Sequence, residues 1–138
     1  MTLDPRIVVA VRSQLRHRQA ALDRGAEHVG WKAGYGIEEV EALIGSTPIP
    51  GYLTTATLVG AATTTRCSHA DVEVVVTLGS DALGVALELV DLTRPAGGMA
   101  ALVESNVMHR GYALGPTGTT LGAARLIVNG KLRRPAST

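Results

Sequence analysis

The stretch from Asp71 to Leu92, DVEVVVTLGSDALGVALELVDL, places acidic residues within apolar runs and predicts two strands folded back on each other. Asp71 and Glu73 are two residues apart, so their side chains share one face of the first strand. Glu88 lies in the return strand among valine, alanine and leucine residues. Because burying an ionised carboxylate without a partner costs several kcal/mol or more, this arrangement requires a compensating charge.

Two arrangements would supply that charge. A hard divalent cation prefers oxygen ligands and would be held by all three carboxylates. Alternatively, Asp71 and Glu73 face solvent on an edge strand, and Glu88 pairs with an arginine. The spacing of these residues leaves both interpretations open.

The composition limits the size and the surroundings of the fold. The 138 residues fit one domain, and 46% are hydrophobic although there is no Phe, one Trp and three Tyr, so we expect an aliphatic core. The net charge of +1, without a dense basic cluster, argues against a nucleic-acid-binding protein. The lone Cys67 excludes an internal disulfide, and neither a signal peptide nor a long apolar run is visible. We therefore expect a cytoplasmic protein that does not enter a membrane.

The chain divides into an N-terminal helical segment (residues 1–27), a core (28–130) and a tail (131–138). Asp4 can cap the helix, Pro5 suits its first turn, and Gly25 ends it. Further predicted elements are helices over 37–44 and 99–107, a strand over 109–116 and a last hairpin with the turn Asn129-Gly130.

Several polar residues outside the three carboxylates are candidates for a site. Lys32, beside the only tryptophan, either holds a substrate carboxylate or enolate, or is a surface lysine next to a packed Trp31. His69, just before Asp71, is a base or an exposed loop histidine. Asn106 and His109 line a pocket, unless Asn106 caps the end of a helix. We take Lys32 and His69 as candidate catalytic residues, and Trp31, Lys32, Asn106 and His109 as candidate substrate-binding residues.

Three short motifs, in this order, give the chain a resemblance to a known family. They are GWKAG (30–34), DVEVVVTLG (71–79) and ALELVDL (86–92). The chain resembles the fumarylacetoacetate hydrolase-like superfamily, in the branch of 2-hydroxypenta-2,4-dienoate (2-keto-4-pentenoate) hydratases and 4-oxalocrotonate decarboxylases. The first motif is similar to the segment that places an active-site lysine. The second and third resemble the family's metal-binding strands, with Asp71 in place of the first glutamate.

A looser similarity covers ESNVMHRGYALG (104–115), so the resemblance spans roughly 28–130. It implies an α+β, mostly β fold, a mixed β-roll preceded by the N-terminal helix. It also implies Mg²⁺ or Mn²⁺ held by Asp71, Glu73 and Glu88, with a small 2-oxo acid chelated through its carboxylate and keto oxygens. Positive charge beside a keto oxygen stabilises an enolate, from which hydration, C–C cleavage, decarboxylation or tautomerisation can follow.

The chain also departs from the family pattern. Family hydratases carry an acidic residue before the glycine that corresponds to Gly51, whereas Pro50 stands there in this chain. The connection between the Glu73 and Glu88 strands is short, and the family continues beyond the segment that matches. An incomplete sheet exposes strand edges, which proteins normally cover. We expect a homodimer or larger homo-oligomer that completes the sheet, unless segments of a longer protein do so.

Three functions fit these features. The first is a metal-dependent lyase or hydratase acting on a small 2-oxo acid. The second is a family member recruited as a cyclase or isomerase in secondary metabolism, with an aliphatic pocket that shapes the substrate. The third is a non-catalytic binding or assembly subunit that has the fold without the activity.

Overall fold

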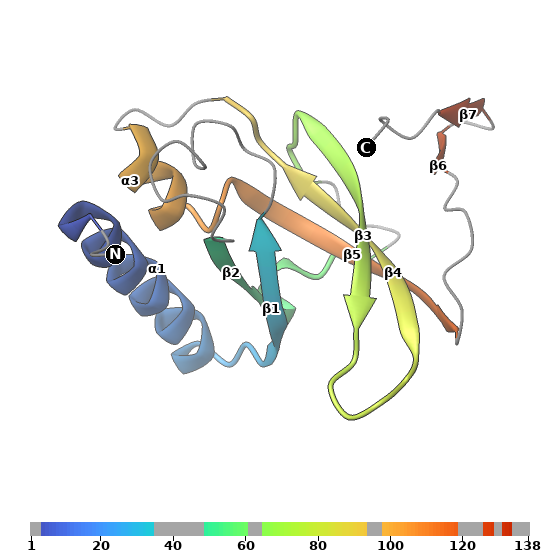
Figure 1. Cartoon of the computed structure of the whole chain (residues 1–138), viewed down its shortest axis with the longest axis horizontal. Helices are drawn as coiled ribbons and strands as arrows, with labels where there is room; N and C mark the ends of the chain where they lie inside the picture. Colours follow the sequence, from blue (N-terminus) through green and yellow to red (C-terminus); the bar gives the residue numbers. More distant parts are fainter. Residues whose placement is uncertain are drawn as a thin grey trace.

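The computed structural model describes residues 4–34, 49–60, 65–93, 98–118, 126–128 and 131–133. Within these residues the chain is a small α+β domain made mostly of strands (Figure 1). The described residues include two α-helices and three sheets, with the strand orders β1-β2, β3-β4-β5 and β6-β7. No helix among the described residues is both long and apolar enough to cross a membrane.

Helix α1 (Pro5–Asp23) begins and ends where the sequence predicts. The Asp4 side chain accepts a hydrogen bond from the backbone N–H of Arg6, and Pro5 occupies the first turn, where a missing N–H costs nothing. At the other end Gly25 adopts a φ of 95° and donates its N–H to the carbonyl of Leu22. Only glycine adopts that backbone conformation without strain, so the helix stops there.

The main core lies between α1 and helix α3 (Gly98–Glu104). It is aliphatic, as the composition predicts, and contains Ile7, Ala10, Ile49, Leu102, Val103 and Val107. Gln14 is buried within the same region and donates from Nε2 to the carbonyl oxygens of Val103 (2.8 Å) and Pro50 (3.3 Å). One amide therefore fastens α1 to both α3 and strand β2.

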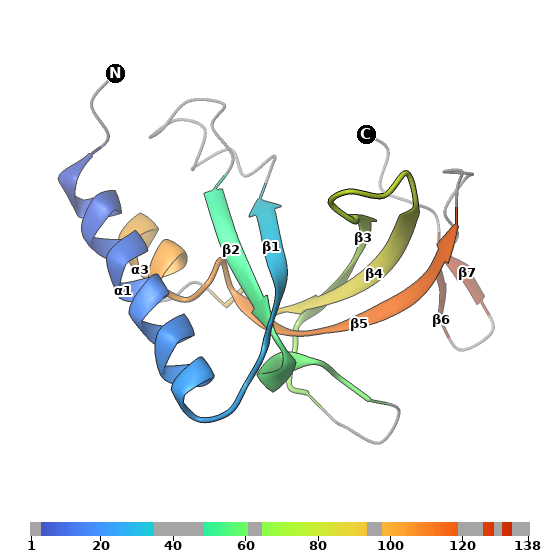
Figure 2. The same cartoon turned by 90° about the horizontal axis from the view of Figure 1, so that it is seen from below.

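The hairpin of strands β1 (His28–Gly34) and β2 (Ile49–Thr54) lies between the helices and the three-stranded sheet (Figure 2). The two strands are antiparallel, with Trp31 opposite Tyr52 and Lys32 opposite Gly51. Residues that follow one another along a strand point to opposite faces. Lys32 can therefore face the three-stranded sheet only if Trp31 turns away from it.

Strands β3 (His69–Val76), β4 (Leu83–Val90) and β5 (His109–Gly118) form the three-stranded antiparallel sheet. The predicted central hairpin is confirmed, with Asp71 directly opposite Glu88 and Glu73 opposite Ala86. Directly opposed residues of an antiparallel pair point to the same side. Asp71, Glu73 and Glu88 therefore occupy one face of the sheet, which we call the site face.

The segment between α3 and β5 differs from the prediction of a helix over 99–107. The helix ends at Glu104, and Asn106, Val107 and Met108 adopt φ values of 59°, 56° and 60°. Three consecutive left-handed residues, one of them β-branched, are costly and persist only where surrounding contacts hold them. Here the contacts include bonds from the N–H of Val107 to the Leu102 carbonyl and from the N–H of Met108 to the Ser105 hydroxyl.

The last two strands, β6 (Leu126–Val128) and β7 (Lys131–Arg133), pair with each other as the predicted hairpin. Val128 faces Lys131, which agrees with a two-residue connection. The turn residues 129–130 themselves, and the helix predicted over 37–44, lie outside the described residues.

The Gln14 bridge leads to a first prediction. Gln14→Leu replaces the amide with an apolar side chain of similar size and removes the Nε2 donor from the buried Val103 carbonyl and the partly buried Pro50 carbonyl. We expect a loss of about 1–3 kcal/mol in the free energy of unfolding, measured by urea denaturation. Gln19→Leu is the matched control, because Gln19 lies on the same helix, is exposed and bonds only Asp23 there. Equal effects of the two substitutions would contradict the bridge.

Candidate functional site

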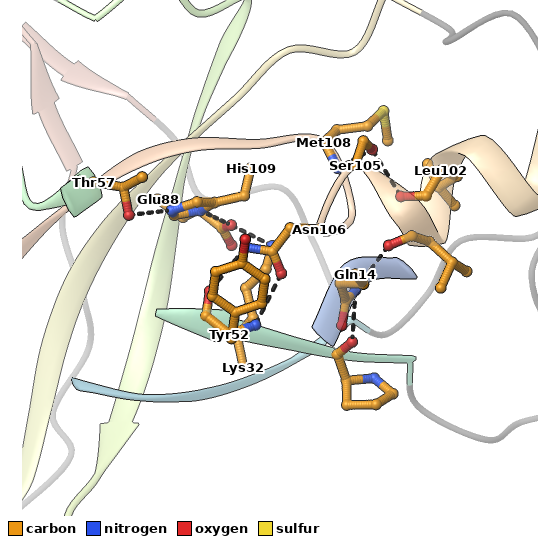
Figure 3. Close-up of polar contacts among 12 residues, drawn as sticks. Gln14, Lys32, Tyr52, Thr57, Glu88, Leu102, Ser105, Asn106, Met108 and His109 are labelled. Atoms are coloured by element: carbon orange, nitrogen blue, oxygen red, sulfur yellow. Dashed lines mark hydrogen bonds and ion pairs between the residues drawn. The ribbon is translucent and has the colours of Figure 1, made fainter. Parts of the chain in front are cut away.

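Glu88 is the centre of a partly buried polar cluster on the site face (Figure 3). Its Oε1 accepts a hydrogen bond from Lys32 Nζ at 2.5 Å and lies 2.7 Å from His109 Nδ1. The side chains of Lys32, Glu88 and His109 are only 14%, 13% and 2% exposed. The sequence left two partners open for Glu88, a divalent cation or an arginine; the structure places a lysine and a histidine against it and no arginine among the described residues.

Lys32 reaches Glu88 across the space between the two sheets, because Gly51 opposite it has no side chain. A Cβ at Gly51 would lie 2.5 Å from Lys32 Cε, 2.8 Å from Lys32 Cγ and 2.7 Å from Asn106 Oδ1. Those distances are far inside van der Waals contact. The lysine stem therefore lies in the place that any larger residue at position 51 would occupy.

Asn106 holds the hairpin beside this cluster. Its Oδ1 accepts from the backbone N–H of Tyr52 and its Nδ2 donates to the Tyr52 carbonyl, both at 2.8 Å. The side-chain amide thus supplies β2 with the two hydrogen bonds that a neighbouring strand would make. Asn106 also ends α3, as one interpretation of the sequence predicted: its backbone is left-handed, its N–H donates to the Val103 carbonyl, and the N–H of Val107 donates to the Leu102 carbonyl. The same backbone directs its side-chain amide toward β2.

His109 is fixed through both ring nitrogens. Nδ1 faces Glu88, and Nε2 lies 2.9 Å from the Thr57 hydroxyl. Since a carboxylate can only accept, Nδ1 carries a proton. Thr57 lies in the short 3₁₀ helix η1 (Thr55–Thr57), and the following residue, Leu58, bridges to Tyr112 of β5. Among the described side chains no buried polar atom lacks a hydrogen-bond partner.

The electrostatics of Glu88 follow from these contacts. Burial alone would raise the pKa of its carboxyl, but the hydrogen bond with His109 and the charge and hydrogen bond of Lys32 outweigh burial and hold that pKa below its ordinary value. Glu88 is therefore ionised at neutral pH. Its contribution to stability is present above its unfolded-state pKa and is lost as the pH falls through the lower, folded-state value.

The pKa of Glu73 is shifted in the opposite direction to that of Glu88. Partial burial raises the pKa of its carboxyl, the negative charges of Glu88 and Asp71 raise it further, and the positive charge of Lys32 opposes them. The three carboxylates are thus close enough to repel one another, as their shared face predicts. Asp71 and Glu73 are both exposed, which agrees with the edge-strand interpretation of the sequence.

The remaining candidates lie further from Glu88. Trp31 points to the other face of β1, where its ring is 56% exposed between Arg18 and His28. His69 begins β3 on the same face as Asp71, is exposed and lies 3.1 Å from the Ser68 hydroxyl. The structure therefore brings Lys32, Glu88, Asn106 and His109 together but places Trp31 outside this cluster.

No family model and no curated protein matches the chain. The resemblance to the fumarylacetoacetate hydrolase-like superfamily accordingly stays a prediction, and the site is interpreted from its own geometry.

The fit of a metal ion can be judged from the residues present. Within the described residues, no three histidine, cysteine, aspartate or glutamate side chains are grouped as a metal-binding set. The chemistry of the site face nevertheless suits a hard cation, because it offers carboxylate oxygens on adjacent strands. Burial raises the pKa of Glu73, and the charges of Glu88 and Asp71 raise it further. By chemical type these oxygen donors suit Mg²⁺ or Mn²⁺, although the described side chains are not gathered around one point.

Two features of the cluster escaped the sequence analysis. Thr57 lies in an Ala/Thr-rich stretch, and nothing in its spacing indicates a contact with His109 more than fifty residues later. Gly51 resembles one more turn residue after Pro50, and its role depends on the side chain opposite. A signal was present only for Gly51, because an antiparallel pairing of GWKAG with PIPGY brings a glycine beside the lysine.

The crowding at Gly51 gives a second prediction. Gly51→Ala must push Lys32 away from Glu88 or displace Asn106 from β2, so we expect a loss of about 1–3 kcal/mol in the free energy of unfolding. Gly30→Ala is the control, since a Cβ at Gly30 in the same hairpin meets nothing within 4 Å. Urea denaturation of both variants measures the difference. A destabilising Gly30→Ala with a neutral Gly51→Ala would refute the packing described here.

The repulsion at Glu73 gives a third prediction. A carboxyl whose folded-state pKa is raised destabilises the fold at pH values above that pKa. Glu73→Gln should therefore raise the free energy of unfolding at pH 7, without divalent metal, by about 0.5 kcal/mol because solvent screens exposed charges. The gain should vanish below about pH 4, where the glutamate is itself neutral. Asp81→Asn, which removes an exposed carboxylate from the connection between β3 and β4, is the matched control, and an equal gain in both variants would contradict the repulsion on the site face.

Proposed function

We propose that the protein is a metal-dependent lyase or hydratase that acts on a small 2-oxo acid. The observation that carries the proposal is the shared face of Asp71, Glu73 and Glu88, with the Lys32 ammonium bound to the third carboxylate. A divalent cation held by these carboxylates, together with the fixed ammonium group, would supply the positive charge that an anionic substrate needs as it gains further negative charge. The β-roll of the resembling family is part of this proposal.

Asp71, Glu73 and Glu88 would hold the metal ion. A cation there would supply positive charge beside the keto oxygen of the substrate, which lowers the cost of an enolate. It would also relieve the repulsion by Glu88 and Asp71, which adds to the effect of burial in raising the pKa of Glu73. The exposure of Asp71 and Glu73 leaves room for a substrate to approach from solvent.

The protein's own residues would orient the substrate and handle protons. The Lys32 ammonium group has three N–H donors and uses one in its hydrogen bond to Glu88 Oε1, so the other two can bind a substrate carboxylate. His109 holds a proton on Nδ1 against the same oxygen, and Thr57 fixes the ring from the far side. Pro50 supplies no acid, so proton transfer to carbon falls to the Lys32–Glu88–His109 cluster or to His69, which shares the site face.

One observation favours the second candidate, a metal-free isomerase or cyclase. Glu88 Oε1 already has two cationic or proton-bearing partners, so the buried carboxylate is satisfied without a metal ion. Such a cluster could move a proton within a substrate by itself. The two candidates differ in whether turnover requires a divalent cation.

A calorimetric titration of the metal-stripped protein with Mg²⁺ and Mn²⁺, with and without oxalate, tests the proposal. We expect metal binding that oxalate tightens, because oxalate mimics the chelating end of a 2-oxo acid. Glu73→Ala should weaken the metal at least about tenfold, or about 1.4 kcal/mol, while Asp81→Ala leaves it unchanged. Turnover of 2-hydroxypentadienoate and other small 2-oxo acids is then assayed with and without the metal.

Other outcomes assign the protein differently. Turnover without any metal requirement would favour the isomerase or cyclase. If the protein binds neither the metal ions nor any 2-oxo acid, the remaining assignment is the non-catalytic subunit. A cytoplasmic location belongs to the same proposal, since an exposed, unpaired Cys67 suits a reducing compartment.

A further inference from the structure

Strand β3 lies at one end of the described three-stranded sheet. The strand order is β3-β4-β5, so β4 pairs with one edge of β3 and no strand in the described part of the chain pairs with the other. A strand edge presents a row of backbone N–H and C=O groups that can pair with another strand. Proteins usually protect such an edge with a bulge, a proline or a lysine.

β3 has none of these three protections, and its acidic residues, Asp71 and Glu73, protect only its first half. Its sequence, HADVEVVV, contains no proline, lysine or arginine, and its register with β4 runs without a shift from His69 to Val76. The two acidic residues point to the site face and leave the opposite face without charge. The edge is therefore straight, and one face beside it is entirely apolar.

That apolar face is exposed. Val72, Val74 and Val76 are 42%, 55% and 64% exposed, although they alternate with residues of the site face. Their partners on β4, Leu87, Val85 and Leu83, extend the aliphatic surface over a second strand. Exposed branched side chains next to an open strand edge are typical of a surface that another strand covers.

We propose that a second copy of this chain pairs with β3, antiparallel and about a two-fold axis through Val74. The two three-stranded sheets then form one continuous sheet of six strands. Val72 of each copy lies opposite Val76 of the other, and Val74 faces its own equivalent. The apolar faces remain on the same side, so six valines make one band across the interface.

The distribution of charge favours a second copy of β3 as the occupant, and charge and strand length together select the register. The carboxylates lie in the first half of β3, at Asp71 and Glu73, and the second half through Thr77 is neutral. Antiparallel pairing through Val74 sets Asp71 opposite Thr77 and Glu73 opposite Val75. Pairing through Val72 would oppose Asp71 to Glu73, pairing through Glu73 would oppose Glu73 to itself, and like charges opposite one another are destabilising. Pairing through Val75 or Val76 would also keep like charges apart, but it would oppose fewer residues of the strand, which ends at Val76. In two antiparallel copies of β3, the acidic half of each strand therefore lies opposite the neutral half of the other.

Sedimentation of the full chain over a range of concentrations tests the surface. We expect a monomer–dimer equilibrium that Val74→Lys weakens at least about tenfold. Val9→Lys is the matched control and should leave the equilibrium unchanged, because Val9 is 60% exposed on α1, away from β3. Circular dichroism checks that both variants keep the fold, as expected for exposed positions. A protein that stays monomeric at its highest soluble concentration, or a dimer that survives Val74→Lys, overturns the proposal.

Cysteine cross-linking tests the register independently of affinity. Cys67 is first replaced, Cys67→Ser, because it is the only native cysteine and is exposed. Val74→Cys should then form a disulfide-linked dimer under mild oxidation. Val72→Cys and Val76→Cys should each stay unlinked alone and cross-link when mixed. Self-linking of Val72→Cys, or no linking in the mixture, overturns the register, and neither result depends on metal binding or turnover.

Discussion

The ion pair between Lys32 and Glu88 is the interaction on which the arrangement of the site depends. It joins the β1–β2 hairpin to the three-stranded sheet in a partly buried place, where each charge needs the other. The absent side chain at Gly51 makes room for the lysine, and the Asn106 amide holds β2 in place through the backbone of Tyr52. The net stability that such a pair adds is small, because the cost of desolvating both charges offsets much of their attraction.

The left-handed segment 106–108 links the core to the site. It turns the chain sharply from α3 into β5, so that one short segment carries Asn106 onto the hairpin and His109 onto Glu88. Val107 meanwhile enters the aliphatic core between the helices. The strain of this backbone is therefore compensated on both sides, by apolar packing and by the hydrogen bonds of two polar residues.

Local sequence patterns predicted the helices and strands well, but they predicted the tertiary contacts between these elements less well. Capping by Asp4, the stop at Gly25 and the period-two alternation of β3 depend on near neighbours, and each is confirmed. The left-handed backbone of Val107 could not be foreseen, because a valine disfavours that conformation and only tertiary contacts impose it. The contact of Thr57 with His109 depends on how η1 lies against β5, which no spacing reveals. The orientation of Trp31 was predictable, since it must oppose its neighbour Lys32.

Both Lys32 and His109 contact the same oxygen of Glu88, and this shared acceptor couples their energies. When one partner is removed, the other still stabilises the carboxylate, so each single deletion understates what the pair provides together. Thr57 belongs to the same chain of bonds through the far nitrogen of the imidazole. The cluster therefore behaves as one cooperative unit, and only a thermodynamic cycle that combines both deletions would reveal how strongly it holds the two sheets together.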